Sequence, residues 1–231
     1  LSDKNNKIYQ DKKGNIWIAS QRGLNSFDPY NIGFRGVGYS GNPKKGLASQ
    51  NVWGFHEDPT GAFLFIAGDH GLTRFDRELH QYIHYNRVTT KSEDFTILDV
   101  FVIDMNNALA ACFDGLYKLE INEENPEKYT YTEIKHTIDD QRGFNKTYKV
   151  VPYKEEGVFL IGTKAGLAIY DKIKNTFEYF YHDPSDEKSI GVGPVRLVYK
   201  SNENRYFLSP SSGGVYEVSG DAEQGYKISQ P

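Results

Sequence analysis

Apolar and polar residues alternate in short runs along the whole chain, and turn residues separate the runs at regular intervals. Alternation with a period of two is typical of β-strands, and no segment shows the 3.6-residue period of an amphipathic helix. One stretch illustrates the pattern, with runs at residues 52–57, 63–67, 72–75 and 81–85. We therefore expect four short antiparallel strands in this stretch, joined by tight connections.

The same four-run pattern occurs five times. Each copy has a glycine followed by Leu or Val between its second and third runs, at Gly23, Gly71, Gly115, Gly166 and Gly214, so the repeat spans 44 to 51 residues. Four-stranded units of roughly 40 to 50 residues are typical of β-propeller blades. We predict an all-β fold, a β-propeller with five four-stranded blades in one region, 1–231. The expected blades span about residues 5–39, 51–85, 97–132, 147–181 and 194–229.

Small residues precede each glycine. We expect the glycine to serve the turn between the second and third strands, and the Leu or Val after it to return to the blade interface. The small pairs before the turn, such as Gly162-Thr163, are expected where neighbouring blades approach closely. Cys112 occupies one of these positions, so we interpret it as a buried spacer. As the single cysteine, it excludes an intrachain disulfide and a cysteine-based zinc site.

The position in the repeat at which the chain starts and ends does not decide whether the blades form a closed ring. The first copy starts with its innermost strand near residues 5–10, and the fifth ends with its outermost strand near residues 226–228. No residues remain to complete a blade begun by the other terminus. The five blades form either a ring closed by packing alone or an arc of a larger ring, and we favour the arc.

Charge and composition narrow the function classes. The 27 Lys and Arg against 31 Asp and Glu give a formal charge of -4, so the chain lacks the cationic field that nucleic-acid binding requires. No run approaches 18 apolar residues, so we expect no membrane contact from this segment. The chain begins at Leu1 and its one methionine is Met105, which indicates an excised or processed piece.

The amino-acid motifs of the repeat resemble those of a known family. Residues 11–20 read DKKGNIWIAS and are followed by Gly-Leu and Phe-Asp, and residues 45–52 and 189–195 form matching inter-blade segments. These motifs closely resemble the two-component-regulator propeller repeat. The resemblance covers nearly all residues, but the third and fifth copies depart from it, with Asn106-Asn107 and Asn204 at the turn glycine.

The resemblance implies a role. The family's propellers form extracytoplasmic sensor regions of hybrid two-component systems in gut Bacteroides and relatives, typically seven-bladed and followed by an immunoglobulin-like domain. They sense oligosaccharides in the periplasm and signal through a membrane helix to a histidine kinase. For this chain the resemblance implies a non-catalytic, periplasmic sensor module without a cofactor. Its expected partners are an oligosaccharide or small-molecule ligand, the missing blades or domains of the same receptor, and a second copy in a dimer.

Two sets of residues are the candidate ligand site. Propellers commonly bind ligands where the innermost strands begin, and one column there is polar, charged or aromatic: Asn6, Trp53, Asp99, Lys149 and Arg196. The loops between second and third strands open on the same face and contribute Arg22, His70, Asp114, Lys164 and Ser212. Trp53 beside His70 is a candidate sugar platform. The alternative is that these residues only line a wet channel.

Other signals are weaker. Residues 36–41 match GxGxxG, but no helix is expected after them, so a nucleotide loop is not indicated. His80 and His84 are expected to be exposed on an outermost strand, Trp17 to be structural, and residues 183–187 to form a solvated turn without calcium.

Two other functions stay open. One is a propeller lyase or hydrolase that uses His70 with Asp99 or Asp114, and the other is a protein-interaction scaffold.

Overall fold

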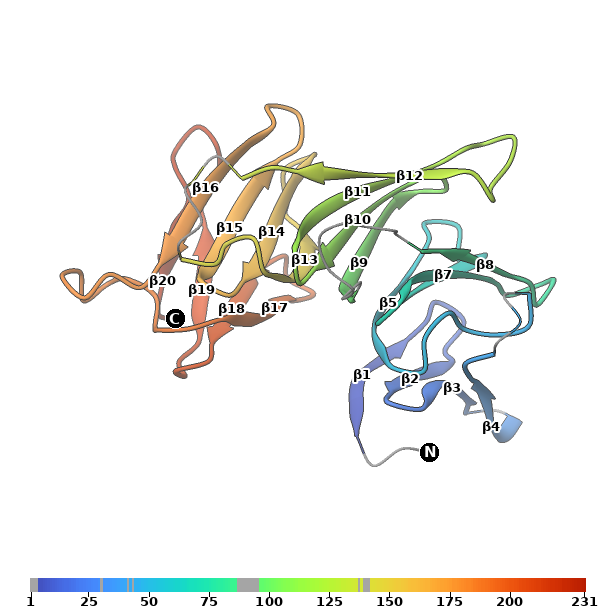
Figure 1. Ribbon diagram of the computed structural model, residues 1–231. Helices are drawn as coiled ribbons and strands as arrows, with labels where there is room; N and C mark the ends of the chain where they lie inside the picture. Colours follow the sequence, from blue (N-terminus) through green and yellow to red (C-terminus); the bar gives the residue numbers. More distant parts are fainter. Residues whose placement is uncertain are drawn as a thin grey trace. The chain divides into compact units, whose positions relative to one another are not determined.

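The computed structural model describes residues 4–29, 31–40, 42, 44–86, 96–136, 138 and 142–231. This part of the chain forms twenty β-strands and no helix (Figure 1). Every four consecutive strands make one antiparallel sheet in simple sequential order. The predicted all-β propeller fold with five four-stranded blades is confirmed.

The strand bounds lie close to the expected ones. Blade 1 contains β1 (Asn5–Gln10), β2 (Ile16–Ser20), β3 (Gly23–Asp28) and β4 (Asn31–Val37). Blade 2 contains β5 (Val52–Glu57), β6 (Phe63–Gly68), β7 (Gly71–Asp76) and β8 (Tyr82–Tyr85). Blade 3 contains β9 (Ile97–Asp104), β10 (Asn107–Cys112), β11 (Gly115–Ile121) and β12 (Tyr129–Ile134).

The last two blades follow the same plan. Blade 4 contains β13 (Thr147–Pro152), β14 (Val158–Thr163), β15 (Gly166–Asp171) and β16 (Thr176–Tyr181). Blade 5 contains β17 (Val195–Lys200), β18 (Tyr206–Pro210), β19 (Tyr216–Ser219) and β20 (Lys227–Ser229). The innermost strands are thus β1, β5, β9, β13 and β17.

The chain divides into two compact units. Unit 1 comprises Leu1–Phe113 and Tyr117–Glu133, and unit 2 comprises Asp114–Leu116 and Ile134–Pro231. Blades 1, 2 and most of blade 3 belong to unit 1, and blades 4 and 5 belong to unit 2. Whether the five blades form a closed ring or an arc concerns the placement of these units and stays a prediction.

Within each unit the core lies between successive blades. One cluster of buried side chains joins blades 1 and 2 and includes Trp17, Leu24, Phe55 and Leu64. A second joins blades 2 and 3 and includes Phe65, Leu72, Val100 and Leu119. In unit 2 a third joins blades 4 and 5 and includes Val151, Leu160, Val198 and Leu208. The burial of Trp17, with 6% of its surface exposed, confirms its structural role.

The glycine between the second and third strands has the expected role. Gly71 has a φ of +111°, and a Cβ there would lie 2.6 Å from the carbonyl oxygen of Tyr85 on the outermost strand. The apolar residue after the glycine is fully buried in blades 1 to 4 (Leu24, Leu72, Leu116 and Leu167). In blade 5 this expectation is wrong, because β19 begins only at Tyr216 and leaves Val215 in the connection, 52% exposed.

The small residues before that turn are confirmed as positions of close approach where blade 4 meets blade 5. A Cβ on Gly162 would lie 2.4 Å from the carbonyl oxygen of Val195 on the neighbouring innermost strand. Cys112 is buried with 3% of its surface exposed, as predicted for a spacer. Side chains larger than these would push the blades apart.

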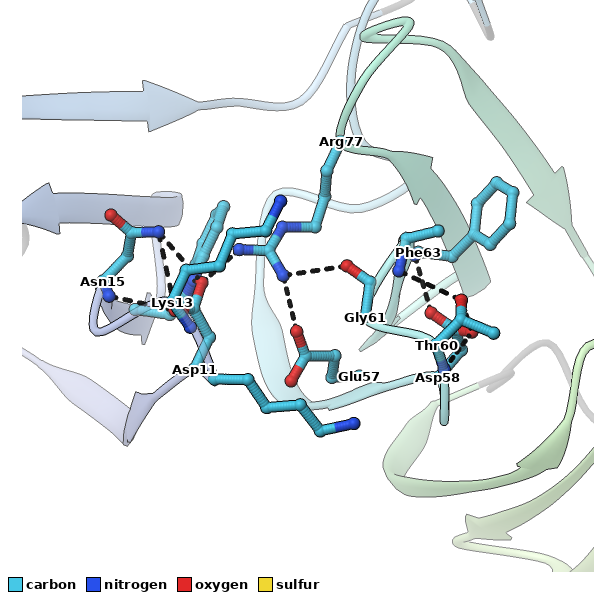
Figure 2. Close-up of polar contacts among 12 residues, drawn as sticks. Asp11, Lys13, Asn15, Glu57, Asp58, Thr60, Gly61, Phe63 and Arg77 are labelled. Atoms are coloured by element: carbon cyan, nitrogen blue, oxygen red, sulfur yellow. Dashed lines mark hydrogen bonds and ion pairs between the residues drawn. The ribbon is translucent and has the colours of Figure 1, made fainter.

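The turns between first and second strands are held by aspartate carboxylates in blades 1 and 2. Asp11 accepts hydrogen bonds from the backbone N–H groups of Lys13 and Asn15, at 2.9 Å each, and from Trp17 Nε1 at 2.8 Å. Asp58 accepts from the N–H groups of Thr60 and Phe63 at 2.9 and 2.7 Å (Figure 2). These bonds satisfy amides that the tight turn leaves without strand partners.

The glycine of these turns has a left-handed backbone, with φ of +86° at Gly14 and +77° at Gly61. Asn204 holds the same place in blade 5 with φ of +56°. Asparagine tolerates this conformation better than other side chains because its amide bonds locally. The departure from the family repeat at this position therefore preserves the turn.

Arg77 joins blade 1 to blade 2 (Figure 2). Its guanidinium forms ion pairs with Asp11 of blade 1 and with Glu57 of blade 2, and it donates to the carbonyl oxygen of Gly61 at 3.1 Å. It also stacks over Trp17, with its Cζ 5.4 Å from the ring centroid. The Arg77 side chain is 9% exposed, and the Asp11 and Glu57 side chains are 0% and 4% exposed. Charges buried to this degree depend on one another for stability.

Removal of the guanidinium should destabilise unit 1. Arg77→Met leaves two buried carboxylates without a cation, and we expect it to lower the free energy of unfolding by about 3–5 kcal/mol. Urea titration followed by tryptophan emission measures this, because both tryptophans lie in unit 1. Lys118→Met is the control, since it removes an exposed pair with Glu120 in the same unit and should cost about 1 kcal/mol or less. Equal losses in the two variants would contradict the role of Arg77.

Unit 1 should lose stability in acid. Burial opposes ionisation of Asp11 and Asp58, but the hydrogen bonds to both carboxylates, and for Asp11 the charge of Arg77, outweigh it and hold each pKa below its usual range. A pKa lowered by folding stabilises the protein above the unfolded-state pKa of about 3.9, and this contribution is lost as the pH falls through the folded-state pKa. We expect urea midpoints, followed by tryptophan emission, to fall from about pH 4 downward. Asp58→Asn should show a smaller fall, and an unchanged midpoint between pH 5 and pH 2.5 in the native sequence would refute the expectation.

Candidate functional site

Each innermost strand carries a β-bulge near its start. Strand pairing with the second strand skips one residue there: Asn6, Trp53, Leu98, Tyr148 and Arg196. A bulge bends the strand and turns the extra side chain away from the regular alternation. The repeated bulge therefore presents one side chain per blade at this end of the sheet, beside the loops between second and third strands.

The pairing register corrects the expected column in two blades. Leu98 and Tyr148, rather than Asp99 and Lys149, are equivalent to Asn6 and Trp53. In blade 4 the turn between the paired residues Pro152 and Phe159 is one residue longer than the turn of blade 1, and in blade 3 the turn glycine is missing. Alignment on the turn therefore shifted both blades by one position.

In unit 1 the side chain of Trp53 is fixed by a carboxylate. Its Nε1 donates to Oδ1 of Asp69 at 2.5 Å, and the Asn51 side-chain amide donates to Oδ2 of Asp69 at 2.6 Å. Asp69 belongs to the loop between β6 and β7, and the indole stays half-buried. Sequence reasoning singled out the next residue, His70, whose side chain is exposed and whose backbone N–H donates to Ser49 Oγ at 2.7 Å. The signal that could have identified Asp69 is an acidic residue in the loop between the second and third strands of the blade whose innermost strand carries a tryptophan.

The other candidates of unit 1 have structural contacts. The Asn6 side-chain amide donates to the carbonyl oxygen of Val52 at 2.6 Å and so links blade 1 to blade 2. Asp99 is buried, and its Oδ1 lies 3.6 Å from Lys7 Nζ. Arg22 is exposed at the tip of its loop. Asn6 and Asp99 thus lie at the predicted end of the blades, but both take part in contacts between blades.

In unit 2 two bulge residues contact each other. The Arg196 guanidinium lies over the ring of Tyr148, with its Cζ 5.1 Å from the centroid. Lys164 is exposed and Lys149 and Asp114 are half-buried. Sequence reasoning missed Tyr148, because the shifted alignment put Lys149 in its place in the column. An aromatic ring covered by a guanidinium is a surface that binds planar or anionic groups.

The remaining motifs show no binding geometry in the described residues. Asp183 Oδ1 accepts from the backbone and hydroxyl of Ser185, which is an ordinary turn. His80 lies in a turn with φ of +55° and is exposed as expected. The expectation is wrong for His84, which is half-buried with Nε2 2.8 Å from the carbonyl oxygen of Gly46.

Other features of the described residues also lack binding geometry. No group of three or more metal-ligating side chains occurs there. The match to GxGxxG starts in β4 and ends at Gly41, which is outside the described residues. No helix in the described ranges is long and apolar enough to span a membrane.

Comparison with known proteins supports the repeat assignment. The model of the two component regulator propeller family matches residues 1–22, which confirms the family resemblance inferred from the repeat. No curated protein matches the sequence significantly.

Solved structures share the fold. The extracellular domain of the putative hybrid two component system BT3049 from B. thetaiotaomicron has a TM-score of 0.73 at 18% identity, over 98% of this chain and 28% of that one. The Cps50 (Swd1) β-propeller domain of Myceliophteria thermophila has a TM-score of 0.72 at 13% identity, over 99% of this chain and 72% of that one. The extracellular domain of the putative one component system BT4673 from B. thetaiotaomicron has a TM-score of 0.54 at 12% identity, over 96% and 32%. At identities this low, the matches show likeness of fold alone. The chain spans less than a third of the length of each of the two B. thetaiotaomicron domains.

Proposed function

We propose that this chain is part of the extracytoplasmic, periplasmic sensor region of a hybrid two-component system, and that it binds an oligosaccharide or glycan breakdown product without turning it over. The family repeat at residues 1–22 supports the system, and the fold likeness to extracellular domains of such systems supports the location. The intact receptor would carry the histidine kinase elsewhere.

The observation that carries the ligand proposal is the tryptophan held at the bulge of β5. A hydrogen bond from Nε1 to Asp69 orients the indole, while part of the ring remains exposed. An aromatic face with polar groups at its edge suits a sugar, whose C–H faces are apolar and whose hydroxyl groups bond amides and carboxylates. Asn51 bonds the same carboxylate and His70 directly follows Asp69, so in this proposal both supply the polar edge.

In unit 2, the contact between the bulge residues Arg196 and Tyr148 is the proposed ligand contact. Arg196 lies over Tyr148 and is exposed, so its remaining N–H groups can reach a ligand hydroxyl. In this proposal Trp53 and Arg196 are the main ligand contacts of their units. Arg22 in unit 1 and Asp114, Lys149 and Lys164 in unit 2 are the proposed secondary contacts, and Asn6 and Asp99 hold the inner strands in place.

Substitution of these contacts should abolish ligand binding. We expect Trp53→Ala and Arg196→Ala in the intact receptor to lose ligand-dependent signalling while their thermal unfolding stays unchanged, because neither side chain belongs to the core. A panel of oligosaccharides, tested by calorimetry and by product analysis, identifies the ligand.

Two controls make the result specific. Tyr39→Ala and Arg205→Ala remove an exposed aromatic residue and an exposed arginine elsewhere and should signal normally. Normal signalling by both Trp53→Ala and Arg196→Ala would overturn the site. Turnover of an oligosaccharide that is lost in His70→Ala would favour the lyase or hydrolase alternative.

The exposed face of blade 5 favours a protein partner as well. Leu197, Tyr199 and Val215 are 58%, 55% and 52% exposed. The pairing register makes Tyr199 equivalent to Val151 of blade 4, which is buried against blade 5. We propose that this face of blade 5 packs against a further blade of the intact receptor. A dimer of the receptor remains a separate proposal.

Isolated chains should therefore associate through blade 5. We expect the Leu197→Lys, Tyr199→Lys double variant to be more monodisperse than the native sequence in light scattering, because it removes the exposed apolar area. Ile173→Lys, at another exposed apolar residue, is the control and should not change association. Monodisperse monomers of the native sequence would refute this expectation.

A further inference from the structure

A groove of about 330 Å³ lies along the innermost strands of blades 1, 2 and 3, entirely within unit 1. It is lined by residues 7, 9 and 12 of blade 1, 55–59 of blade 2 and 101–103 of blade 3. The lining begins at Lys7 and Phe55, one and two residues beyond the bulge residues Asn6 and Trp53, and extends to the turns between first and second strands. The groove therefore shares no lining residue with the proposed site at the bulges.

The groove has an aromatic wall built by three blades. Tyr9, His56 and Phe101 occupy equivalent positions, because each is the third residue after the bulge in its innermost strand. All three side chains are half-buried. The rings of His56 and Phe101 are 4.7 Å apart and tilted by 58°. In blade 4 the equivalent residue is Val151, so the aromatic column is a feature of unit 1.

The imidazole of His56 is neutral in this wall. The backbone N–H of Val102 donates to His56 Nδ1 at 3.3 Å, so Nδ1 carries a lone pair and the ring proton is on Nε2. A neutral imidazole stacks on a flat ring as other aromatic groups do. The wall thus offers ring faces without a fixed charge of its own.

One cation at the edge of the groove can receive an anion. Glu57 forms an ion pair with Arg77, which also pairs with Asp11, and accepts from the Tyr9 hydroxyl at 3.2 Å. The Asp58 carboxylate keeps its charge and accepts hydrogen bonds from its turn. Lys12 is exposed, and its Nζ donates to the carbonyl oxygen of Pro59 at 2.9 Å at the edge of the groove. Among the described residues no carboxylate forms an ion pair with Lys12. The ammonium group can therefore receive a carboxylate from a ligand.

We propose that this groove is a second binding site, specific for a small carboxylate that carries a single ring. The ring lies on Tyr9, His56 and Phe101, and the carboxylate bonds to the Lys12 ammonium. The volume is near the lower end of ligand sites, which suits one ring rather than an oligosaccharide. This inference does not depend on the proposed sensor function, because none of the lining residues belongs to the proposed oligosaccharide site.

Titration with matched acids and neutral compounds tests the site. Benzoate against benzamide, and D-glucuronate against D-glucose, are followed by amide NMR shifts of unit 1 and by calorimetry. We expect at least one acid to shift the Val102 amide and to bind more tightly than its neutral partner. The two pairs distinguish an aromatic ring from a sugar ring.

Variants assign the contacts. Lys12→Gln should weaken the acid about fivefold and leave the neutral compound unchanged, as expected for an exposed ion pair. Phe101→Leu should weaken both, since it removes the ring face but keeps the apolar volume. Lys13→Gln is the matched control, because Lys13 is an exposed neighbour outside the groove.

Three outcomes would overturn the proposal. The first is equal binding of the acids and their neutral partners, and the second is equal effects of Lys12→Gln and Lys13→Gln. The third is the absence of shifts at groove residues with either acid. Trp53→Ala must leave acid binding unchanged if the two sites are separate, so failure of the oligosaccharide proposal and failure of this one are distinguishable.

Discussion

Burial of one blade's apolar face against the next is the interaction on which the rest of each unit depends. A four-stranded sheet cannot cover its own faces, so its buried side chains gain stability only from a neighbour. Gly162 against the Val195 carbonyl shows how closely the sheets approach, and Arg77 adds an ionic link between blades 1 and 2. The candidate binding residues are positioned by this packing, because the innermost strands that carry them are the edges of the packed sheets.

The β-bulge gives this packed scaffold its candidate binding surface. Regular alternation would send every innermost side chain to one blade face or the other, but the extra residue leaves that pattern. It is an asparagine, a tryptophan or an arginine in three blades, and a leucine or a tyrosine in the other two. One backbone feature thus repeats five times while its side chain varies, which allows chemistry to change without a change in fold.

The two ends of the innermost strands in unit 1 differ in chemistry. At the bulge end, a carboxylate from a loop orients an indole, which suits a neutral, hydroxyl-rich ligand. At the turn end, Glu57 is paired with Arg77 and the Asp58 carboxylate bonds its turn amides, while Lys12 lies at the edge of the groove beside an aromatic wall. Arg77 thereby stabilises the contact between blades 1 and 2 and also pairs with a carboxylate that lines the groove.

Strand alternation and turn glycines are local properties, so the amino-acid pattern alone predicts the blades. The predicted run 52–57 is β5, and Asn204 replaces a turn glycine without loss of its conformation. The sequence also identified Trp17 and Cys112 as core residues. It misplaced Asp99 and Lys149, since a bulge leaves no mark in composition and a turn one residue longer shifts the alignment. Only the tertiary structure placed Asp69 on Trp53 and aligned Tyr9, His56 and Phe101 across three blades. Those contacts join residues far apart in sequence, and their geometry depends on strand register and blade packing rather than on local pattern.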